Sequence, residues 1–359
     1  MPAGARCRLA ELTFSGPKLT NEGWGSVKMA SDDGPAEIGL LIYPGAQLAA
    51  VHGLTDLCQV ANRIAGAQTV LVPPMIRVSH WQPDSEAEII ERTFDTHPKL
   101  IGKPGIIVAP PSLSGLPPSS VTARLAHWLS ERHADGATLA SVCMGAYLLA
   151  ETGLLKGRVV TTHWSQAGAL GERFPDLTVD AEKLIIDDGD IITAGGVMAW
   201  TDLGLRLVDR LLGPAVMIET ARFLLVDPPG REQRYYGSFS PKLRHGDGAV
   251  LKVQHWLQDE GTRGVTLAAM AALAGLEERT FLRRFRKATG LKPTEYCQHL
   301  RIGKARTMLE LTGQSVERIA WEVGYENPGA FRKVFVKVTG LSPGDYRRRF
   351  GVGSSAGAA

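Results

Sequence analysis

Short apolar runs rich in valine and isoleucine recur between residues 37 and 164, with helical segments between several of them. The runs are IGLLIY (38–43), TVLVPPMI (69–76), GIIVAPPS (105–112), ATLASVC (137–143) and RVVTTHW (158–164). The helical segments are GLTDLCQVANRIAG, SSVTARLAHWLSERHA and GAYLLAETGLL. Strands that alternate with helices predict an α/β domain, a mostly parallel sheet with helices on both faces.

The pattern changes in the second half of the chain. KLIIDDGDIITAGG (183–196) predicts a β-hairpin that turns at Asp188-Gly189, and two helices are expected within 197–226. Residues 227–248 are rich in proline, glycine and charge and have no apolar period, which is typical of a linker. The predicted order is a leader (1–36), an α/β domain (37–228), a linker (229–248), an all-α domain (249–350) and a tail (351–359). Met29 precedes the first strand and is an alternative start to Met1.

The all-α part contains an internal repeat. FRKATGLKPTEY (285–296) matches FVKVTGLSPGDY (335–346), and MAALAGL (270–276) matches IAWEVGY (319–325). Each repeat reads as a short helix, a glycine turn, a second helix and a proline that starts the next segment. Gly275 and Gly324 occupy the position where a helix-turn-helix needs a positive φ. The repeat therefore predicts two helix-turn-helix units.

The second helix of each repeat has an apolar face and a cationic face. Apolar residues recur at i, i+4 and i+7, as Phe281, Phe285 and Ala288 and as Phe331, Phe335 and Val338. Cations follow the opposite face, as Arg279, Arg283 and Arg286 and as Arg332 and Lys333. In a helix-turn-helix this face meets base edges and phosphates. Two repeats with the same plan favour DNA binding over a solvated helical bundle.

Charge and composition agree with this interpretation. Residues 241–350 hold 20 Lys and Arg against 11 Asp and Glu, although the whole chain carries only +3. A basic C-terminal part indicates a polyanionic partner. No apolar run is long enough to span a membrane, and the N-terminus lacks a signal core. The four scattered cysteines predict neither a zinc site nor a disulfide framework and fit the cytoplasm.

Residues 250–350 resemble the DNA-binding domain of AraC/XylS-type transcription regulators. The resemblance is carried by SVERIAWEVGYENPGAFRKVFVKVTGLSPGDYR. It implies two helix-turn-helix units joined by a long helix (293–310), with both second helices in successive major-groove segments. The implied base-reading positions are Arg279, Leu282 and Arg283 in the first unit and Asn327, Gly329, Arg332 and Lys333 in the second. Arg286, on the cationic face of the first unit, is a further candidate for DNA binding.

Cys143 lies between a predicted strand and a predicted helix. Ser141 and Gly145 stand two positions either side, which is the pattern of a nucleophile elbow. The start of a helix increases the thiolate character of a cysteine, and His163 ends another run and is a candidate partner. A buried cysteine and a capping histidine are the alternative.

Residues 37–226 resemble the PfpI/ThiJ, class I glutamine-amidotransferase-like fold. SVCMGAYLLAETGLLKGRVVTTHW and DDGDIITAGGVMAWTDLGLRLV are similar to the version in GlxA-type regulators, and the implied sheet is flavodoxin-like. Enzymes of this family place an acid beside the cysteine, at a position that falls at or near Ala50 here. Gln47 is close but is no carboxylate. The expected protein is therefore not an enzyme, and Cys143 and His163 are vestigial candidates.

The resemblance implies a ligand pocket at the carboxyl ends of the strands. Its candidate residues are Tyr43, Gly45, Gln47, Cys143, Met144, His163 and Trp164. The expected effector is a small nitrogenous metabolite such as an amine or amino acid, and no cofactor or metal is expected. Tyr43 and Trp164 are candidates for a cation–π wall or for packing.

The sequence thus predicts a ligand-responsive transcription regulator that binds double-stranded promoter DNA. A homodimer and RNA polymerase are further candidate partners. The alternatives are a Cys/His hydrolase or lyase tethered to DNA and a redox sensor that uses Cys143.

Overall fold

The computed structural model describes residues 34–68, 76–84 and 89–352, which divide into two compact units. The N-terminal unit includes the described residues up to Thr162 together with 170–179 and 185–230. The C-terminal unit begins at Arg231 and also includes residues 163–169 and 180–184. Most of the expected leader and tail lies outside the described residues.

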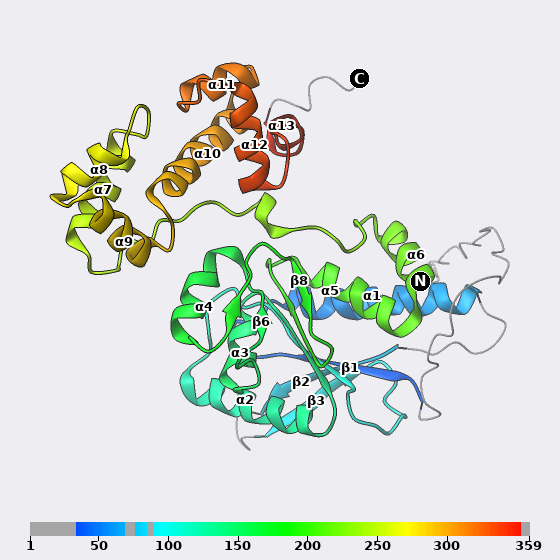
Figure 1. The fold of residues 1–359 in the computed structure, drawn as a ribbon. Coiled ribbons are helices and arrows are strands. Elements are labelled where there is room, and N and C mark those ends of the chain that lie inside the picture. The colour runs from blue at the N-terminus through cyan, green and yellow to red at the C-terminus, as the bar shows by residue number, and fades with distance from the viewer. Residues whose placement is uncertain (1–33, 69–75, 85–88, 353–359) are drawn as a thin grey trace, which may run out of the picture. The chain divides into compact units, whose positions relative to one another are not determined.

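The described part of the N-terminal unit is built on a seven-stranded sheet in the order β3-β2-β1-β4-β5-β9-β8 (Figure 1). The strands are β1 (Ala36–Leu41), β2 (Ile76–Pro83), β3 (Ile90–Asp95), β4 (Ile106–Ala109), β5 (Thr138–Val142), β8 (Ile185–Asp187) and β9 (Ile191–Ala194). Pairing is parallel from β2 through β1, β4 and β5 to β9, and antiparallel at β3 and β8. The mostly parallel sheet and the hairpin at 183–196 are therefore confirmed.

Helices cover both faces of this sheet. They are α1 (Leu48–Gln68), α2 (Ser119–Ala134), α3 (Gly145–Glu151), α4 (Ala167–Arg173, shared between the units), α5 (Trp200–Leu212) and α6 (Pro214–Leu224). α1 packs with α5 and α6, whereas α2 packs with α3. All four residues of β4 are buried, as a central parallel strand requires, because helices exclude water from both of its faces.

One predicted strand is shorter in the structure than expected, and another lies almost wholly outside the described residues. The run at 69–76 lies outside the described residues except Ile76, where β2 begins, and the edge strand β3 was missed because its sequence, IERTFD, is polar. The run at 158–164 forms only β6 (Val159–Val160), which pairs with β7 (Thr178–Val179) in a separate two-stranded sheet. Side chains replace the ladder beyond it: the Thr161 amide donates to Thr193 Oγ1, and Thr162 Oγ1 donates to the Cys143 carbonyl oxygen.

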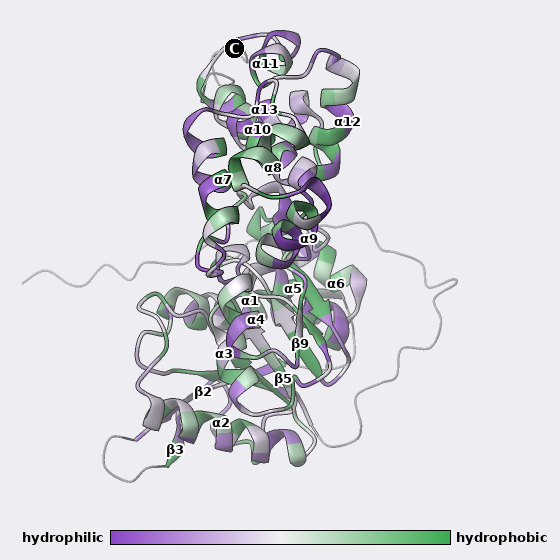
Figure 2. Ribbon diagram, turned by 60° about the vertical axis from the view of Figure 1, so that its left-hand side comes forward, coloured by the Kyte–Doolittle hydropathy of each residue, from purple (hydrophilic) through white to green (hydrophobic). Residues whose placement is uncertain are grey.

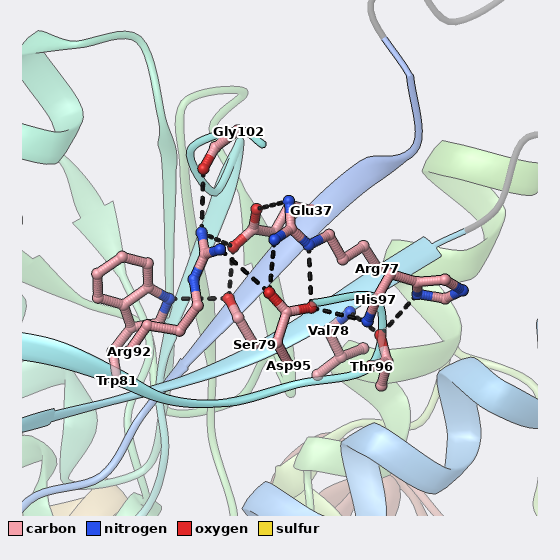
Figure 3. A network of polar contacts seen from close by, with 10 residues as sticks. All are labelled: Glu37, Arg77, Val78, Ser79, Trp81, Arg92, Asp95, Thr96, His97 and Gly102. Atoms are coloured by element: carbon pink, nitrogen blue, oxygen red, sulfur yellow. Dashed lines mark hydrogen bonds and ion pairs between the residues drawn. The ribbon is translucent and has the colours of Figure 1, made fainter. Parts of the chain in front are cut away.

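A buried ion-pair network joins the first three strands (Figure 3). Arg77 on β2 is 2% exposed and contacts Glu37 on β1 at 3.0 Å and Asp95 on β3 at 2.5 Å. Arg92 contacts Glu37 at 2.8 Å, and its guanidinium lies 4.9 Å from the Trp81 ring centroid. Each buried charge therefore has an opposite partner, which offsets the cost of removing it from water.

The described helices of the C-terminal unit form two subdomains joined by α10 (Pro293–Leu311). The first subdomain contains α7 (Gly248–Asp259), α8 (Leu267–Ala274) and α9 (Glu278–Thr289). The second contains α11 (Val316–Glu322), α12 (Pro328–Thr339) and α13 (Pro343–Phe350). Gly275 and Gly324 turn the chain with φ of 65° and 91°, so the glycine turns lie where the repeat predicted them.

The segment expected to be a linker makes hydrogen bonds and ring contacts in the C-terminal unit. It contains the short 3₁₀ helix η2 (Gln233–Tyr235), and Arg306 on α10 donates to the carbonyl oxygens of Arg234 and Gly237. The Phe239 ring stacks on His299 of α10. None of the helices in the described ranges has the length and apolar character to cross a bilayer.

Candidate nucleic-acid interface and cysteine site

The first subdomain presents α9 with one buried and one exposed face. Phe281 and Phe285 are fully buried, and the Phe285 ring contacts Tyr296 of α10 at a centroid distance of 5.3 Å. The predicted DNA-binding residues of this helix, which are Arg279, Leu282, Arg283 and Arg286, are all exposed. Leu282 is 37% exposed and offers an apolar surface among the arginines. The strongly hydrophilic positions along α9 are visible in Figure 2.

Arg284 on the same helix has a different partner. Its guanidinium donates two hydrogen bonds to the Asp247 carboxylate at 2.7 and 2.8 Å. These bonds hold the pKa of Asp247 below its usual range. Asp247 also caps α7 by accepting a hydrogen bond from the Val250 amide. The Arg284–Asp247 ion pair connects α9 to the start of α7. No local sequence pattern predicts this ion pair, because 37 residues separate its members.

The second subdomain presents α12 in the same way, with Phe331 and Phe335 buried and Arg332 and Lys333 exposed. Its first residues have structural roles as well. Asn327 caps α12, since its Oδ1 accepts hydrogen bonds from the Gly329 and Ala330 amides at 2.7 and 3.1 Å. A base contact by Asn327 would therefore have to use its amide nitrogen.

Gly329 and Arg332 also have neighbours that the sequence did not reveal. A Cβ at Gly329 would lie 2.9 Å from Asn327 Oδ1, so glycine leaves room for the cap. Arg332 bonds the exposed Glu317 carboxylate of α11. An acid in the first turn of α11, two residues after the Ser315 cap, is the signal in the sequence that could have located this partner.

The cysteine site lies where β5 passes into α3. Cys143 adopts a φ of 53°, which non-glycine residues seldom do, and the residue is only 3% exposed. A Cβ at Gly145 would lie 2.2 Å from the Ala109 carbonyl oxygen, which explains the small residue there. Met144 occupies the N-cap position of α3 without a side-chain capping hydrogen bond, and Ser141 is fully buried. The backbone therefore has the sharp strand-to-helix turn of an elbow.

Three candidate pocket residues belong to the loop that leads from β1 into α1. Tyr43 is buried and donates to the Pro110 carbonyl oxygen at 2.5 Å, and burial raises its pKa. The Gly45 carbonyl oxygen accepts hydrogen bonds from Ser112 Oγ and from the Leu113 amide. Gln47 is almost buried, and its Nε2 lies 3.9 Å from Met198 Sδ. Tyr43 packs within the hydrophobic core of the N-terminal unit.

The two other pocket candidates, His163 and Trp164, fall in the C-terminal unit. His163 Nδ1 lies 2.8 Å from Ser165 Oγ and accepts a hydrogen bond from the Ser165 amide, so it caps the 3₁₀ helix η1 (Trp164–Gln166). Burial lowers its pKa. The Trp164 amide donates to Gln233 Oε1 at 3.1 Å.

The position expected to carry an acid is apolar. Ala50 lies in the first turn of α1 and is fully buried. Cys58, Cys143 and Cys297 are buried, and burial raises the pKa of the Cys58 thiol to about 12. Within the described residues, the acids, histidines and cysteines form no cluster of three or more that could bind a metal.

Comparisons with known proteins match both parts of the chain. A helix-turn-helix domain family matches residues 270–349, and the DJ-1/PfpI family matches residues 115–210. The chain is 31% identical over 219 residues to the HTH-type transcriptional regulator GlxA of Rhizobium meliloti, covering 60% of this chain and 67% of that relative. It is 29% identical over 232 residues to the HTH-type transcriptional regulator CdhR of Pseudomonas aeruginosa, covering 64% and 69%.

Among solved structures, an AraC family transcriptional regulator from Pseudomonas putida aligns with 53% of this chain and 100% of its own, at 18% identity and a TM-score of 0.42.

Proposed function

Because the chain belongs to the AraC-type helix-turn-helix transcription regulators that carry a DJ-1/PfpI domain, we propose that it reads a specific operator and responds to a small metabolite. α9 and α12 are the reading helices, and the N-terminal unit binds the effector. Double-stranded DNA is the partner of the C-terminal unit. A second copy of the chain and RNA polymerase complete the proposed assembly at a promoter.

One observation carries the DNA-binding part of this proposal. Both second helices bury a phenylalanine pair on one face and expose cations on the other, directly after a positive-φ glycine turn. In helix-turn-helix proteins this helix lies in the major groove, where arginine forms paired hydrogen bonds with guanine. The proposed base-reading positions are Arg279, Leu282 and Arg283 on α9 and Asn327, Gly329, Arg332 and Lys333 in the second subdomain. Arg286 is proposed as a further DNA contact of α9.

The cysteine site supports a sensing role for the N-terminal unit. The elbow at Cys143 keeps its strained backbone, whereas the position of the family acid holds the buried Ala50. Without a carboxylate to exchange protons with the thiol, hydrolysis loses its acid–base partner. We propose that Tyr43, Gly45, Gln47, Cys143 and Met144 contribute to an effector site instead, and that the effector is a nitrogenous metabolite.

A route from the effector to the DNA-binding helices follows from the chain itself. Thr162, which donates to the Cys143 carbonyl oxygen, directly precedes His163 and Trp164. Trp164 in turn bonds Gln233, whose neighbour Arg234 is held by Arg306 of α10. An effector that moves residues 162–164 would therefore act on the segment that packs on α10. We propose this segment as the path of the response.

Two experiments test the function. Full-length protein is used to select duplexes from a random-sequence library, and enrichment of one sequence pattern supports operator binding, whereas the absence of enrichment contradicts it. Thermal shift with a panel of small amines and amino acids then tests sensing. A compound that raises the melting temperature and changes affinity for the selected duplex supports the proposal, and a panel without any such compound contradicts the nitrogenous class.

A second candidate function is a Cys/His hydrolase or lyase tethered to DNA, and the strained φ of Cys143 favours it. Cys143→Ala separates the two functions. A regulator keeps operator binding and its ligand response, whereas an enzyme loses turnover of its substrate. A redox role for the same thiol would instead make operator binding sensitive to peroxide in the wild type and insensitive in Cys143→Ser.

A further inference from the structure

The two helix-turn-helix subdomains have separate apolar cores, and α10 contributes to both. Tyr296 and Cys297 from its first half pack in the first core. Ile302 and Ala305 from its second half pack in the second core. Arg301 lies between these pairs, at the point where the helix leaves one core and enters the other. Arg301 is therefore placed where it can contact both subdomains.

The Arg301 guanidinium donates hydrogen bonds to both subdomains. Toward the first subdomain, Nη2 donates to the Thr262 carbonyl oxygen at 2.6 Å and Nε donates to Thr262 Oγ1 at 3.1 Å. Toward the second subdomain, Nη1 donates to the Gly324 carbonyl oxygen at 3.1 Å. Thr262 lies between α7 and α8, and Gly324 is the turn between α11 and α12. One side chain therefore connects a loop of each subdomain.

The surroundings of Arg301 fit this connection. Thr262 is buried, which strengthens its hydrogen bonds relative to bonds in water. Arg301 Cζ lies 3.5 Å from the Cβ position of Gly324 and 5.4 Å from the Tyr325 ring centroid. A planar guanidinium can donate hydrogen bonds to carbonyl groups on two sides at once. The single ammonium of lysine does not have N–H groups fixed in the same directions.

We propose that Arg301 is the positioning residue that fixes the separation of α9 and α12, and with it the number of base pairs between the two DNA segments they read. The inference rests on operator binding by both helices. Helices that enter successive major-groove segments must lie about one helical turn apart, about 34 Å. An inserted base pair displaces one segment by about 3.4 Å and turns it by about 35°. A fixed pair of subdomains therefore discriminates against insertions.

The experiment compares affinities for matched duplexes. Full-length protein is titrated with a duplex that it selects from a random library. It is also titrated with versions of this duplex that carry one or two extra base pairs between the segments read by α9 and α12. Wild-type protein is expected to lose about tenfold or more in affinity per inserted base pair, because the contacts of one subdomain are lost. Arg301→Met removes the three hydrogen bonds. For this variant the loss of affinity on the same insertions is expected to be about fivefold smaller than for the wild-type protein.

Lys304→Met is the matched control, since it removes the same charge from an exposed position of α10 and should keep the wild-type spacing penalty. Thr262→Val removes only the Oγ1 acceptor and is the variant to measure if Arg301→Met does not fold, with a relaxed spacing penalty again expected. The proposal is overturned if a folded Arg301→Met or Thr262→Val protein loses as much affinity per inserted base pair as the wild type. It is also overturned if Lys304→Met reduces this loss equally. If the wild-type protein selects no duplex, operator binding itself is contradicted, and this proposal falls with it.

Discussion

The two helix-turn-helix subdomains have matching cores but different outer surfaces. Phe281 and Phe285 correspond to Phe331 and Phe335, and all four are fully buried. On the outside, α9 carries five Lys and Arg residues and α12 carries three. Moreover, the second helix uses Asn327 for its own cap, and Arg332 bonds Glu317. A duplicated fold can therefore keep its packing while its surfaces diverge, and the first subdomain has the stronger potential for base contacts.

The largest expected effect tests the similarity of the cores. Phe285→Ala and Phe335→Ala should each lower the free energy of unfolding by about 3–5 kcal/mol, because each empties a site packed against other aromatic rings. Urea denaturation of both variants measures this. Val336→Ala, at an exposed position of α12, is the control and should change stability by at most about 0.5 kcal/mol. Clearly unequal losses of unfolding free energy for the two phenylalanine variants would show that the two cores are not equivalent.

The next prediction tests the difference between the surfaces. Arg283→Ala should weaken binding to the selected operator by about 1–3 kcal/mol if it pairs with a guanine. Arg332→Ala should cost less, because Arg332 must first leave Glu317 to reach DNA. Gel-shift titrations at one fixed salt concentration compare the two variants with wild type. Unchanged binding in Arg283→Ala, or a larger loss in Arg332→Ala, would reverse the ranking of the two subdomains.

A smaller effect separates capping from DNA reading in the second subdomain. Asn327→Ala removes the cap of α12 and should lower the free energy of unfolding by about 1 kcal/mol. Asn327→Asp keeps a capping oxygen but adds a negative charge at the proposed DNA surface. It should therefore preserve stability while weakening binding, and the two variants together show which role dominates. If Asn327→Ala leaves the free energy of unfolding unchanged, the cap does not contribute to stability in solution.

The smallest effect concerns the acid dependence of the first subdomain. Because Arg284 lowers the pKa of Asp247, the pair stabilises the fold above the unfolded-state pKa of aspartate, about 3.9. This stability is lost as the pH falls through the lower folded-state pKa. Asp247→Asn can still cap α7 but cannot titrate. Melting curves from about pH 5 to about pH 3 should therefore show a smaller decrease for Asp247→Asn than for wild type. Equal decreases would exclude Asp247 as a source of acid sensitivity.

The sequence predicted most of what depends on local pattern. The glycine turns at Gly275 and Gly324 and the buried phenylalanine pairs follow from spacing alone, since a helix repeats every 3.6 residues. The parallel sheet follows from alternating strands and helices. The short strand β6 did not follow, because the side chains of Thr193 and Thr162 replace the ladder beyond it. The first accepts from the Thr161 amide and the second donates to the Cys143 carbonyl oxygen, and an apolar run does not reveal this.

Contacts between distant residues could not be predicted in this way. Arg284 looks like another member of a cationic face until Asp247 is found beside it, and Arg301 looks like a solvated helix residue until Thr262 and Gly324 are found around it. His163 and Cys143 belong to different compact units, so their pairing stays a prediction. Spacing along a chain predicts faces of helices, whereas the partner of a charge depends on the completed fold.

Sequence reading by α9 and α12 is tested by the affinity of the full-length protein for its selected duplex relative to a shuffled duplex of equal composition, measured by fluorescence anisotropy across a salt series. The selected duplex should bind at least about 10³-fold more tightly near physiological salt. Affinity for both duplexes should fall as salt rises, because the cationic faces of α9 and α12 replace counterions on phosphates. Equal affinity for the two duplexes throughout the series would contradict the claim that these helices read sequence.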